Sequence, residues 1–464
     1  PGQRRSKIGT GARLVLDQIP TLLEKLVLGR NIARRAALAA RVPRGVLQRV
    51  QAAEFQTTLA RVAQHSRFYQ RQFAARGMDP RKIKHPRDLG DFYTTAQDLR
   101  EQPVEDFLCA RPQAGFETTG TTARNKRVYF SNEEVHDIGF EGAVGLWNLG
   151  MRPEDRAVDA FDYAFWNAGI TLMHSLNAMG CFHVLASKLA PEEFYRRIKE
   201  YDFNVMIVDT AWLVSLTEIA AREGAWPLKF ILSGSENMSE STRAWIERVW
   251  RCKVYQAYGQ TETLGATAIE CPAQKGYHLN EANFLFEIRD PGPDGFGELV
   301  FTTLTRKVMP LIRSRSNDIT RFLDEPCTCS LRSLRRIDKI QGRGDEIVSC
   351  GMGMISPWIF ETWLGGHDAL AEDWQVAVTQ PGARDVIEAR VELKPGSVAP
   401  SDLTADLLRS FAATFPYYEK NRAMGLFDLQ VQILPRGTLR QRLGTGARAK
   451  LRRVVDDRSP VLAR

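Results

Sequence analysis

The sequence contains no long run of apolar residues. Although 44% of its 464 residues are hydrophobic, no stretch approaches the roughly 20 uncharged apolar residues that a membrane-spanning helix needs. Near the N-terminus no apolar core is followed by a small-residue cleavage site, so a secretory signal is not expected. Cysteine is scarce, and its odd count of seven in a long chain is typical of a reducing compartment. We therefore expect a cytoplasmic protein without a membrane span.

Most of the chain carries no excess of positive charge. The formal net charge is +8, but residues 1–50 hold eleven lysines and arginines against two acidic residues, which leaves 52 basic and 53 acidic side chains for the rest. A basic body of the kind that binds nucleic acid is therefore not expected. We predict that residues 1–44 form a basic N-terminal arm. Residues 21–40 suit an amphipathic helix that docks on the protein's own surface or on a partner, the alternative being an anionic membrane surface or a nucleic acid.

Apolar and polar segments alternate regularly in the middle of the chain. Apolar runs of strand length at 205–208, 230–232 and 254–258 are separated by helical stretches such as 240–250. This alternation predicts an α/β fold with a substantial sheet. One long helix is expected earlier, over residues 45–75.

The pattern changes after residue 343. Strand-like alternation at 387–393 and 427–433 flanks a helical stretch at 403–411, which predicts a small α+β module. Residues 342–345 form a glycine-bracketed polar segment suited to a hinge. The predicted organisation is the arm 1–44, a large multi-sheet N-terminal domain 45–343, and a small C-terminal domain 344–464.

A threonine-rich run before residue 126 suits a phosphate-binding loop. Glycine lets the backbone approach a ligand closely, hydroxyl and amide groups donate to phosphate oxygens, and a lysine supplies the counter-charge. The run is not a Walker A loop, because no Gly-Lys-Ser/Thr follows at the required spacing. On this chemistry alone, a Thr/Gly-rich turn between strands is an equal alternative. The run comprises Thr118, Thr119, Gly120, Thr121 and Thr122, and Lys126 follows it.

Three cysteines and a histidine form a possible metal set. Cys271 stands seven residues before His278, and Cys327 stands two before Cys329. Three sulfurs and one imidazole suit tetrahedral Zn²⁺, and four protein ligands leave no open position for water, so a structural role is predicted. The alternative is two unrelated pairs of small buried side chains.

Five further motifs follow the threonine-rich run. They are residues 234–236, 258–262, 310–318 and 342–346, and Lys450 with 451–456 after it. Their order resembles that of the adenylate-forming enzymes, and specifically the phenylacetate–CoA ligase-like branch, over about residues 45–458. Each motif is a modest signal alone, whereas six in the same order are a specific one.

The resemblance implies an enzyme that uses ATP to activate a carboxylic acid. It would form an acyl-AMP, release pyrophosphate, and transfer the acyl group to a thiol, first of all that of coenzyme A. An amine or a carrier-protein phosphopantetheine thiol is the alternative acceptor. A non-catalytic nucleotide- or nucleic-acid-binding module on the same fold is the alternative class. ATP, Mg²⁺ and coenzyme A are the implied cofactors and co-substrate, and the branch often forms homodimers.

The resemblance also assigns roles to the motif residues. The threonine-rich run, with Thr121 among the catalytic residues, would hold the β- and γ-phosphates. Glu262 would ligate Mg²⁺, Asp318 would accept hydrogen bonds from both ribose hydroxyls, and Arg343 would add a donor to the nucleotide. Adenine would lie on the backbone after residue 232 and against the ring of Tyr258. This tyrosine could equally be a core residue. The residues of the adenine site are Gly234, Ser235, Glu236, Tyr258, Gly259 and Thr261.

Lys450 is the implied mobile catalytic lysine. Its compact charge would bridge the carboxylate and the α-phosphate in the transition state. The mobile C-terminal domain would swing about Asp345 to deliver it. Arg448, Arg452 and Arg453 stand close by, so the alternative is that Lys450 is one more basic residue of a solvated tail.

Aromatic residues near two strand ends are expected to form the acid pocket, as the corresponding segments do in relatives. An aromatic-lined apolar slot fits an aryl or arylacetic acid. Such residues are also common in cores, which is the alternative. The candidates are Phe161, Tyr163, Phe165, Trp166, His174, Trp212 and Gly259.

Besides Ser316 and Asn317 in the ribose motif, where threonine and arginine or glycine are usual, the chain departs from the family pattern at two sites. Ala123 and Asn125 stand where the phosphate loop has a second glycine and a proline, and alanine does not readily adopt positive φ. Residues 350–357 replace a more polar family segment that helps to build the second half-reaction. This second departure bears on the acyl acceptor more than on adenylation.

Overall fold

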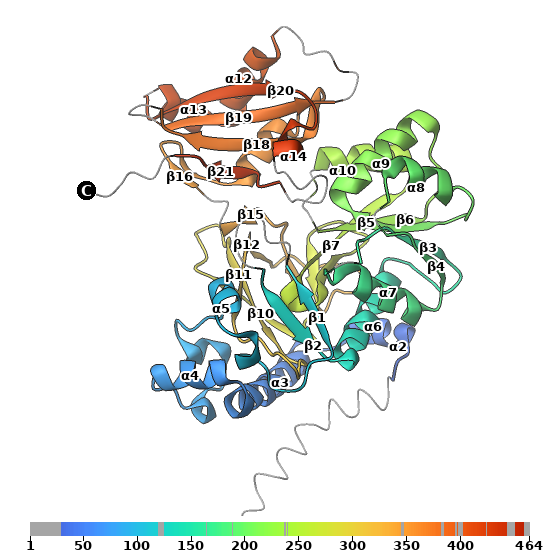
Figure 1. The fold of residues 1–464 in the computed structure, drawn as a ribbon, viewed down its shortest axis with the longest axis vertical. Helices are drawn as coiled ribbons and strands as arrows, with labels where there is room; N and C mark the ends of the chain where they lie inside the picture. The colour runs from blue at the N-terminus through green and yellow to red at the C-terminus, as the bar shows by residue number, and fades with distance from the viewer. Residues whose placement is uncertain are drawn as a thin grey trace, which may run out of the picture.

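The computed structural model (Figure 1) describes most of the chain. The described residues are 29–118, 125–163, 165–187, 189–235, 238, 240–344, 348–381, 385–394, 397, 402–423, 425–442 and 451–458. Within them, none of the helices is long and apolar enough to cross a membrane.

The described part of the chain begins with three helices, α2 (Ile32–Ala39), α3 (Arg44–His65) and α4 (Arg67–Ala75). The prediction of one helix over 45–75 is therefore wrong at Ser66. That residue has extended backbone angles, and its hydroxyl accepts a hydrogen bond from the Tyr69 amide at 3.4 Å, which caps α4. Its Oγ also donates to the carbonyl of Asp106 at 2.8 Å, so the break is fixed by tertiary contacts.

A nine-stranded sheet dominates the N-terminal part, in the order β13-β14-β9-β8-β7-β6-β5-β3-β4. The strands from β4 to β7 run parallel, whereas β7 pairs with β8 in antiparallel fashion. The strand bounds are β3 Arg156–Asp159, β4 Phe182–Leu185, β5 Val205–Asp209, β6 Phe230–Gly234, β7 Lys253–Gln260, β8 Gly265–Glu270, β9 Tyr277–Leu279, β13 Phe322–Leu323 and β14 Arg336–Ile337.

Helices cover both faces of the parallel strands (Figure 1). In β5, Met206 and Val208 join one apolar core with helices α8 to α10, while Val205 and Ile207 join a second core with α6 and α7. Burial on both faces explains why these strands read as continuous apolar runs in the sequence. The helices are α6 Asn132–Asn148, α7 Ala168–Met179, α8 Pro191–Ile198, α9 Thr210–Glu223 and α10 Glu240–Trp250.

A second sheet and a hairpin complete the N-terminal part. The sheet has the order β10-β11-β12-β15 and is antiparallel throughout, and β1 pairs with β2. A third apolar core joins these strands to α3 and α4. The bounds are α5 Ala96–Glu101, β1 Ala114–Glu117, β2 Arg127–Phe130, β10 Phe284–Arg289, β11 Gly297–Thr303, β12 Ser314–Thr320 and β15 Gly342–Arg343.

The C-terminal part has its own sheet, β20-β19-β18-β21, and its own apolar core. Leu451 is buried with Leu434 and Leu439 in a smaller cluster, and β21 then pairs in parallel with β18. The bounds are β16 Val348–Cys350, β17 Gly353–Ile355, α11 Pro357–Leu364, β18 Leu370–Thr379, β19 Asp385–Leu393, α12 Leu403–Thr414, α13 Pro416–Ala423, β20 Phe427–Leu434, α14 Thr438–Arg442 and β21 Val454–Asp456. The predicted fold class, α/β with a large multi-sheet domain and a smaller α+β domain, is confirmed.

Polar contacts join the two parts. Arg436, before α14, donates to the carboxylate of Glu218 in α9 at 2.5 and 2.6 Å. The Thr242 hydroxyl in α10 donates to the carboxylate of Glu372 in β18. These contacts join the C-terminal part to α9 and α10, beside the large sheet (Figure 1).

Candidate active site

The end of β7 is shaped by a close approach to β8. A Cβ added to Gly259 would lie 2.0 Å from the carbonyl oxygen of Gly265, so only glycine fits there. The ladder is irregular between Tyr258 and Gly259, and Leu264 adopts a left-handed conformation with φ of 63°. This local geometry turns the chain from β7 into the short helix Thr261–Thr263, which carries Glu262.

Glu262 is buried and paired with Lys126. The Lys126 ammonium donates to its carboxylate, and Arg306 donates to its backbone carbonyl at 2.6 Å. Burial raises the pKa of Glu262, but the charge and hydrogen bond of Lys126 outweigh burial and hold the pKa below its usual value. Glu262 is therefore an ionised, buried carboxylate at the end of the sheet.

A second cluster of polar side chains surrounds Asp318. Tyr258 donates to its Oδ2 at 2.6 Å and Gln260 donates to the same atom at 2.5 Å. Arg343 is its register partner across the β12–β15 ladder, with Nη1 3.8 Å from Oδ1. Burial, followed by the charge of Asp318, raises the pKa of Tyr258 well above its ordinary value, so Tyr258 stays a donor. Three side chains from two strands, β7 and β15, thus surround the Asp318 carboxylate.

One cavity of about 1130 Å³ brings the predicted site residues together. Its wall includes residues of the C-terminal part, among them Glu361 and Arg453, so both parts of the chain enclose it. Ser235, which follows β6, adopts a left-handed φ of 74° at this wall. The predicted nucleotide residues on the wall are Thr118, Lys126, Gly234, Ser235, Tyr258, Gly259, Thr261, Glu262, Asp318 and Arg343.

Several predicted site residues lie outside the described residues. They are Thr119, Gly120, Thr121, Thr122, Glu236, Asp345 and Lys450.

The acid pocket differs from its prediction. Phe161, Trp166 and Gly259 line the cavity, but four of the predicted wall residues lie elsewhere. The Tyr163 hydroxyl donates to Asp159, and Phe165 is 71% exposed.

Trp212 is the third of these residues. It packs edge-on against Phe194 at 4.6 Å between ring centroids, and its indole N–H donates to the Leu189 carbonyl at 2.8 Å. Trp212 is therefore a core residue of the α8–α9 layer. His174, the remaining aromatic candidate, lies 5.7 Å from His136 and is absent from the wall.

Two residues of the cavity wall that sequence reasoning missed are Thr171 and Gly265. A Cβ on Gly265 would lie 2.9 Å from the Thr171 hydroxyl, and both residues line the cavity. Gly265 stands three residues after the 258–262 motif, and this glycine is the signal in the sequence for a close approach at this position.

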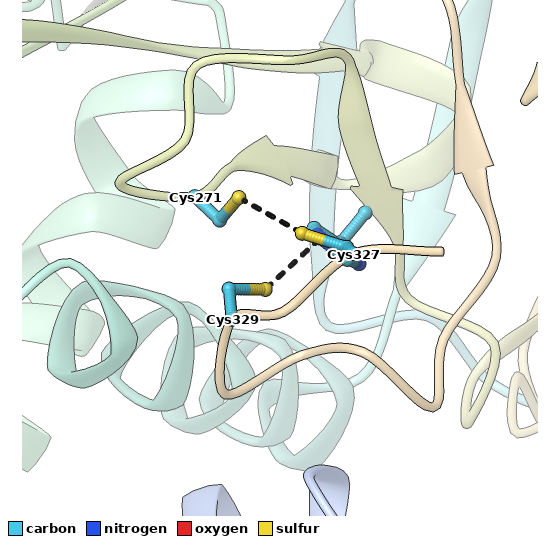
Figure 2. A group of neighbouring side chains, drawn as sticks. Cys271, Cys327 and Cys329 are labelled. Carbon is cyan, nitrogen blue, oxygen red and sulfur yellow. Dashed lines mark hydrogen bonds between the residues drawn. The ribbon is translucent and has the colours of Figure 1, made fainter. Parts of the chain in front are cut away.

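The cysteine–histidine set forms a compact cluster (Figure 2). One ligand atom from each residue lies within 4.8 Å of all the others. Cys271 Sγ lies 3.7 Å from Cys327 Sγ, and Cys329 Sγ lies 3.2 Å from His278 Nε2. His278 is placed in β9 by its pairing with β14, and its Nδ1 lies 3.3 Å from the Leu334 carbonyl, which orients the ring. The hydrogen bond from Cys329 lowers the pKa of Cys271.

This donor set fits a tetrahedral metal ion. Three sulfurs and an imidazole nitrogen converge from the loop after β8, from β9 and from the loop before β14. The second ring nitrogen already has a carbonyl partner, as is usual for metal-ligating histidines.

Comparison with known proteins agrees with this geometry. The family model described as AMP-binding enzyme matches residues 118–283. Phenylacetate-coenzyme A ligase of Aromatoleum evansii is 30% identical over 343 residues, covering 70% of this chain and 77% of that protein. Phenylacetate-coenzyme A ligase of Escherichia coli (strain K12) is 28% identical over 369 residues, covering 76% and 84%.

Solved structures share the fold. A 2-hydroxyisobutyryl-CoA ligase in the postadenylation state superposes with a TM-score of 0.77 at 18% identity, over 90% of this chain and 91% of that chain. The same ligase in the thioesterification state gives 0.62 at 20% identity, over 91% and 92%.

Fold and site together define an enzyme of the adenylate-forming superfamily. The chain belongs to the phenylacetate–CoA ligase-like branch of that superfamily, as its motifs predicted. It is an acid–CoA ligase that activates a carboxylic acid with ATP as the acyl-AMP and then forms the coenzyme A thioester.

Proposed function

We propose that this ligase acts on an aryl or arylacetic acid with ATP and Mg²⁺. The observation that carries the proposal is one cavity in which Glu262, Asp318 and Trp166 share a wall. A nucleotide at Asp318 and an acid at Trp166 would place the carboxylate and the phosphates next to Glu262. The names of the relatives from Aromatoleum evansii and Escherichia coli make phenylacetate the first acid to test.

Asp318 would bind the ribose. Its carboxylate is buried and held in place by Tyr258 and Gln260, so little ordering is needed when two hydroxyls bind. Arg343 stands on the neighbouring strand and would add a donor to the nucleotide. Gly234 and Ser235, at the end of β6, would support the adenine, and Tyr258 would lie against it.

Glu262 would hold Mg²⁺. An ionised carboxylate is the oxygen donor that this ion prefers, and Glu262 keeps a low pKa although it is buried. The bound ion would neutralise charge on the triphosphate. Lys126 now balances the charge of Glu262 and would turn to the phosphates, together with the threonine-rich run that contains Thr121.

The C-terminal domain, residues 344–464, would carry the catalytic lysine. Lys450 would stabilise the transition state of adenylation by contacting the carboxylate and the α-phosphate. Rotation about Asp345 would then exchange this arrangement for one that admits coenzyme A to the N-terminal domain, residues 45–343.

The cysteine–histidine cluster would bind structural Zn²⁺. Its four ligands leave no open coordination site, and it lies beside β9 and β14 at one side of the large sheet. The ion would tie the loop before β14 to the sheet and would take no part in the reaction.

One assay tests the proposal. The protein is incubated with ATP, Mg²⁺ and a panel of aryl acids, and pyrophosphate release is measured with and without coenzyme A. We expect acid-dependent pyrophosphate and a thioester; a broad panel without acid-dependent pyrophosphate would overturn the proposal. Hydroxylamine traps the acyl-AMP, so hydroxamate without any thioester would indicate an amine or a carrier-protein thiol as the acceptor.

A further inference from the structure

The cavity extends well beyond the nucleotide and a single ring. From Trp166 and Thr171 its wall continues along one face of α6, through Ile138, Gly142 and Gly145. These residues are spaced by three or four positions, as expected for a single helix face. A volume of about 1130 Å³ exceeds the roughly 300–1,000 Å³ of a pocket for one drug-sized ligand. There is room for a nucleotide and for an acid much larger than phenylacetate.

The far end of the cavity lies at the corner between α2 and α3. Leu38, Val42, Leu47 and Val50 line it there, and we call these four residues the α2–α3 corner. α6 lies between α7, which borders the acid pocket, and α2 (Figure 1). A ligand that reaches from the acid pocket to the corner must therefore pass along α6.

Gly145 keeps this passage wide. A Cβ at this position would lie 3.4 Å from Cδ1 of Ile269 in β8, which is ordinary van der Waals contact, so alanine fits. A longer side chain would project into the space between α6 and β8. Gly142 is different, because its Cβ would lie 2.3 Å from Ser175 Oγ, which makes it a packing residue between α6 and α7.

The corner favours an apolar ligand. The charges near it are paired, Arg35 with Glu141 at 3.4 Å and Arg44 with Glu281 at 2.5 Å, and so demand no charge from a ligand. Neighbouring Val46 also lines the cavity and is 46% exposed, so the corner reaches the protein surface.

We propose that the substrate is a monocarboxylic acid with a long apolar tail that lies over Gly145 and ends in the α2–α3 corner. The acid group binds beside the nucleotide, and the tail is an alkyl or aryl-alkyl chain that continues past the position of a single ring. This inference rests on the proposed ligase function and specifies its substrate.

A series of ω-phenylalkanoic acids tests the inference. Wild-type protein is assayed for pyrophosphate release with phenylacetate and with homologues extended by two, four, six and eight methylenes. We expect kcat/KM to rise by up to roughly fourfold for each methylene that becomes buried, and then to level off. A maximum at phenylacetate with a steady fall along the series would overturn the inference while leaving the ligase function intact. Absence of pyrophosphate with every acid would instead count against the ligase function itself.

Two substitutions at one position locate the tail. Gly145→Leu should lower the ratio of kcat/KM for the longest acid to that for phenylacetate by about tenfold or more, because its side chain fills the passage. Gly145→Ala, the matched control, should keep the wild-type ratio. Equal loss for both acids in Gly145→Leu, with an unchanged melting temperature, would contradict this path for the tail.

A variant on a separate element guards against misfolding of α6. Val42→Trp changes no residue of α6, and by narrowing the corner it should shorten the acid length at which kcat/KM levels off. An unchanged length profile in a folded Val42→Trp protein would place the tail elsewhere.

Discussion

The ammonium of Lys126 is paired with the carboxylate of Glu262, two side chains that are 136 residues apart in the sequence. The pair joins the segment after the threonine-rich run to the short helix after β7. Glu262, which we propose holds the metal ion, thus already has its charge balanced by Lys126, which we propose binds phosphate. A metal–nucleotide complex would supply a new partner to each member of the pair.

The first prediction concerns Glu262. In Glu262→Gln the proposed Mg²⁺ ligand loses its charge, and acid-dependent pyrophosphate release should fall by about 100-fold or more. Raising the Mg²⁺ concentration should recover part of the rate. Glu154→Gln, at an exposed glutamate outside the cavity wall, is the matched control and should retain the wild-type rate. A Glu262→Gln protein with wild-type activity and Mg²⁺ dependence would refute the metal role.

Asp318 should govern nucleotide affinity. Hydrogen bonds to a charged group contribute about 1.5–3 kcal/mol, so Asp318→Asn should raise the dissociation constant for ATP by roughly 10- to 100-fold. Tyr258→Phe removes one of the donors to Asp318 but keeps the ring, so its effect should be smaller. Isothermal titration with ATP measures both. An unaltered affinity in Asp318→Asn would exclude the ribose role.

Lys450 should act on the chemical step and leave nucleotide binding nearly intact. Lys450→Ala should slow acyl-AMP formation by about 100-fold or more, because the charge that it supplies is needed in the transition state. ATP affinity should remain within about threefold of wild type on the same argument. Arg448→Ala is the control for a general loss of basic charge. If Arg448→Ala loses the activity and Lys450→Ala keeps it, the lysine has been assigned to the wrong residue.

The metal cluster should contribute to stability. The purified protein should contain about one zinc ion per chain, and Cys329→Ser should lose it and lower the melting temperature by about 5 °C or more. Cys252→Ser serves as the control, because Cys252 lies outside the cluster. Zinc-free protein whose melting temperature does not respond to a chelator would end the metal interpretation.

Asp159 should make stability depend on pH. Burial raises its pKa to about 7, despite hydrogen bonds from the Tyr163 hydroxyl and the Phe161 amide. An unfolded aspartate ionises near pH 3.8, so between pH 3.8 and about 7 the folded state holds a proton that the unfolded state has lost. The stabilising contribution of this group is therefore complete below pH 3.8 and declines as the pH rises to about 7.

Asp159→Asn cannot ionise, so it lacks this decline. The free energy of unfolding of Asp159→Asn minus that of the wild type should therefore be larger at pH 8 than at pH 5. Urea denaturation at the two pH values measures the shift. Parallel pH profiles for the two proteins would show that Asp159 ionises in the folded state as it does in the unfolded state.

Much of the fold could be predicted because burial leaves a mark on the sequence. Strands β5, β6 and β7 are covered on both faces, so they appear as apolar runs that simple inspection finds. The break at Ser66 could not be found in this way, because it depends on a contact with Asp106, 40 residues further along the chain.

The residues of the proposed acid pocket were predicted only in part, because their placement also depends on contacts that are distant in the sequence. Trp166 and Trp212 both follow strands and are equally aromatic, yet the first lines the cavity and the second fills the α8–α9 core. Aromatic character alone does not decide between these two environments. The choice depends on the helix packed against each ring, which no local pattern records.

The burial of Leu451 has a consequence for how Lys450 moves. Leu451 follows the lysine directly and is anchored beside Leu434 and Leu439, and the chain then enters β21. The residue that follows the proposed catalytic lysine is therefore anchored in the C-terminal part, and we expect the lysine to move with that part. On this expectation, a substitution at the distant Arg436–Glu218 contact should alter the timing of the two half-reactions without touching either substrate.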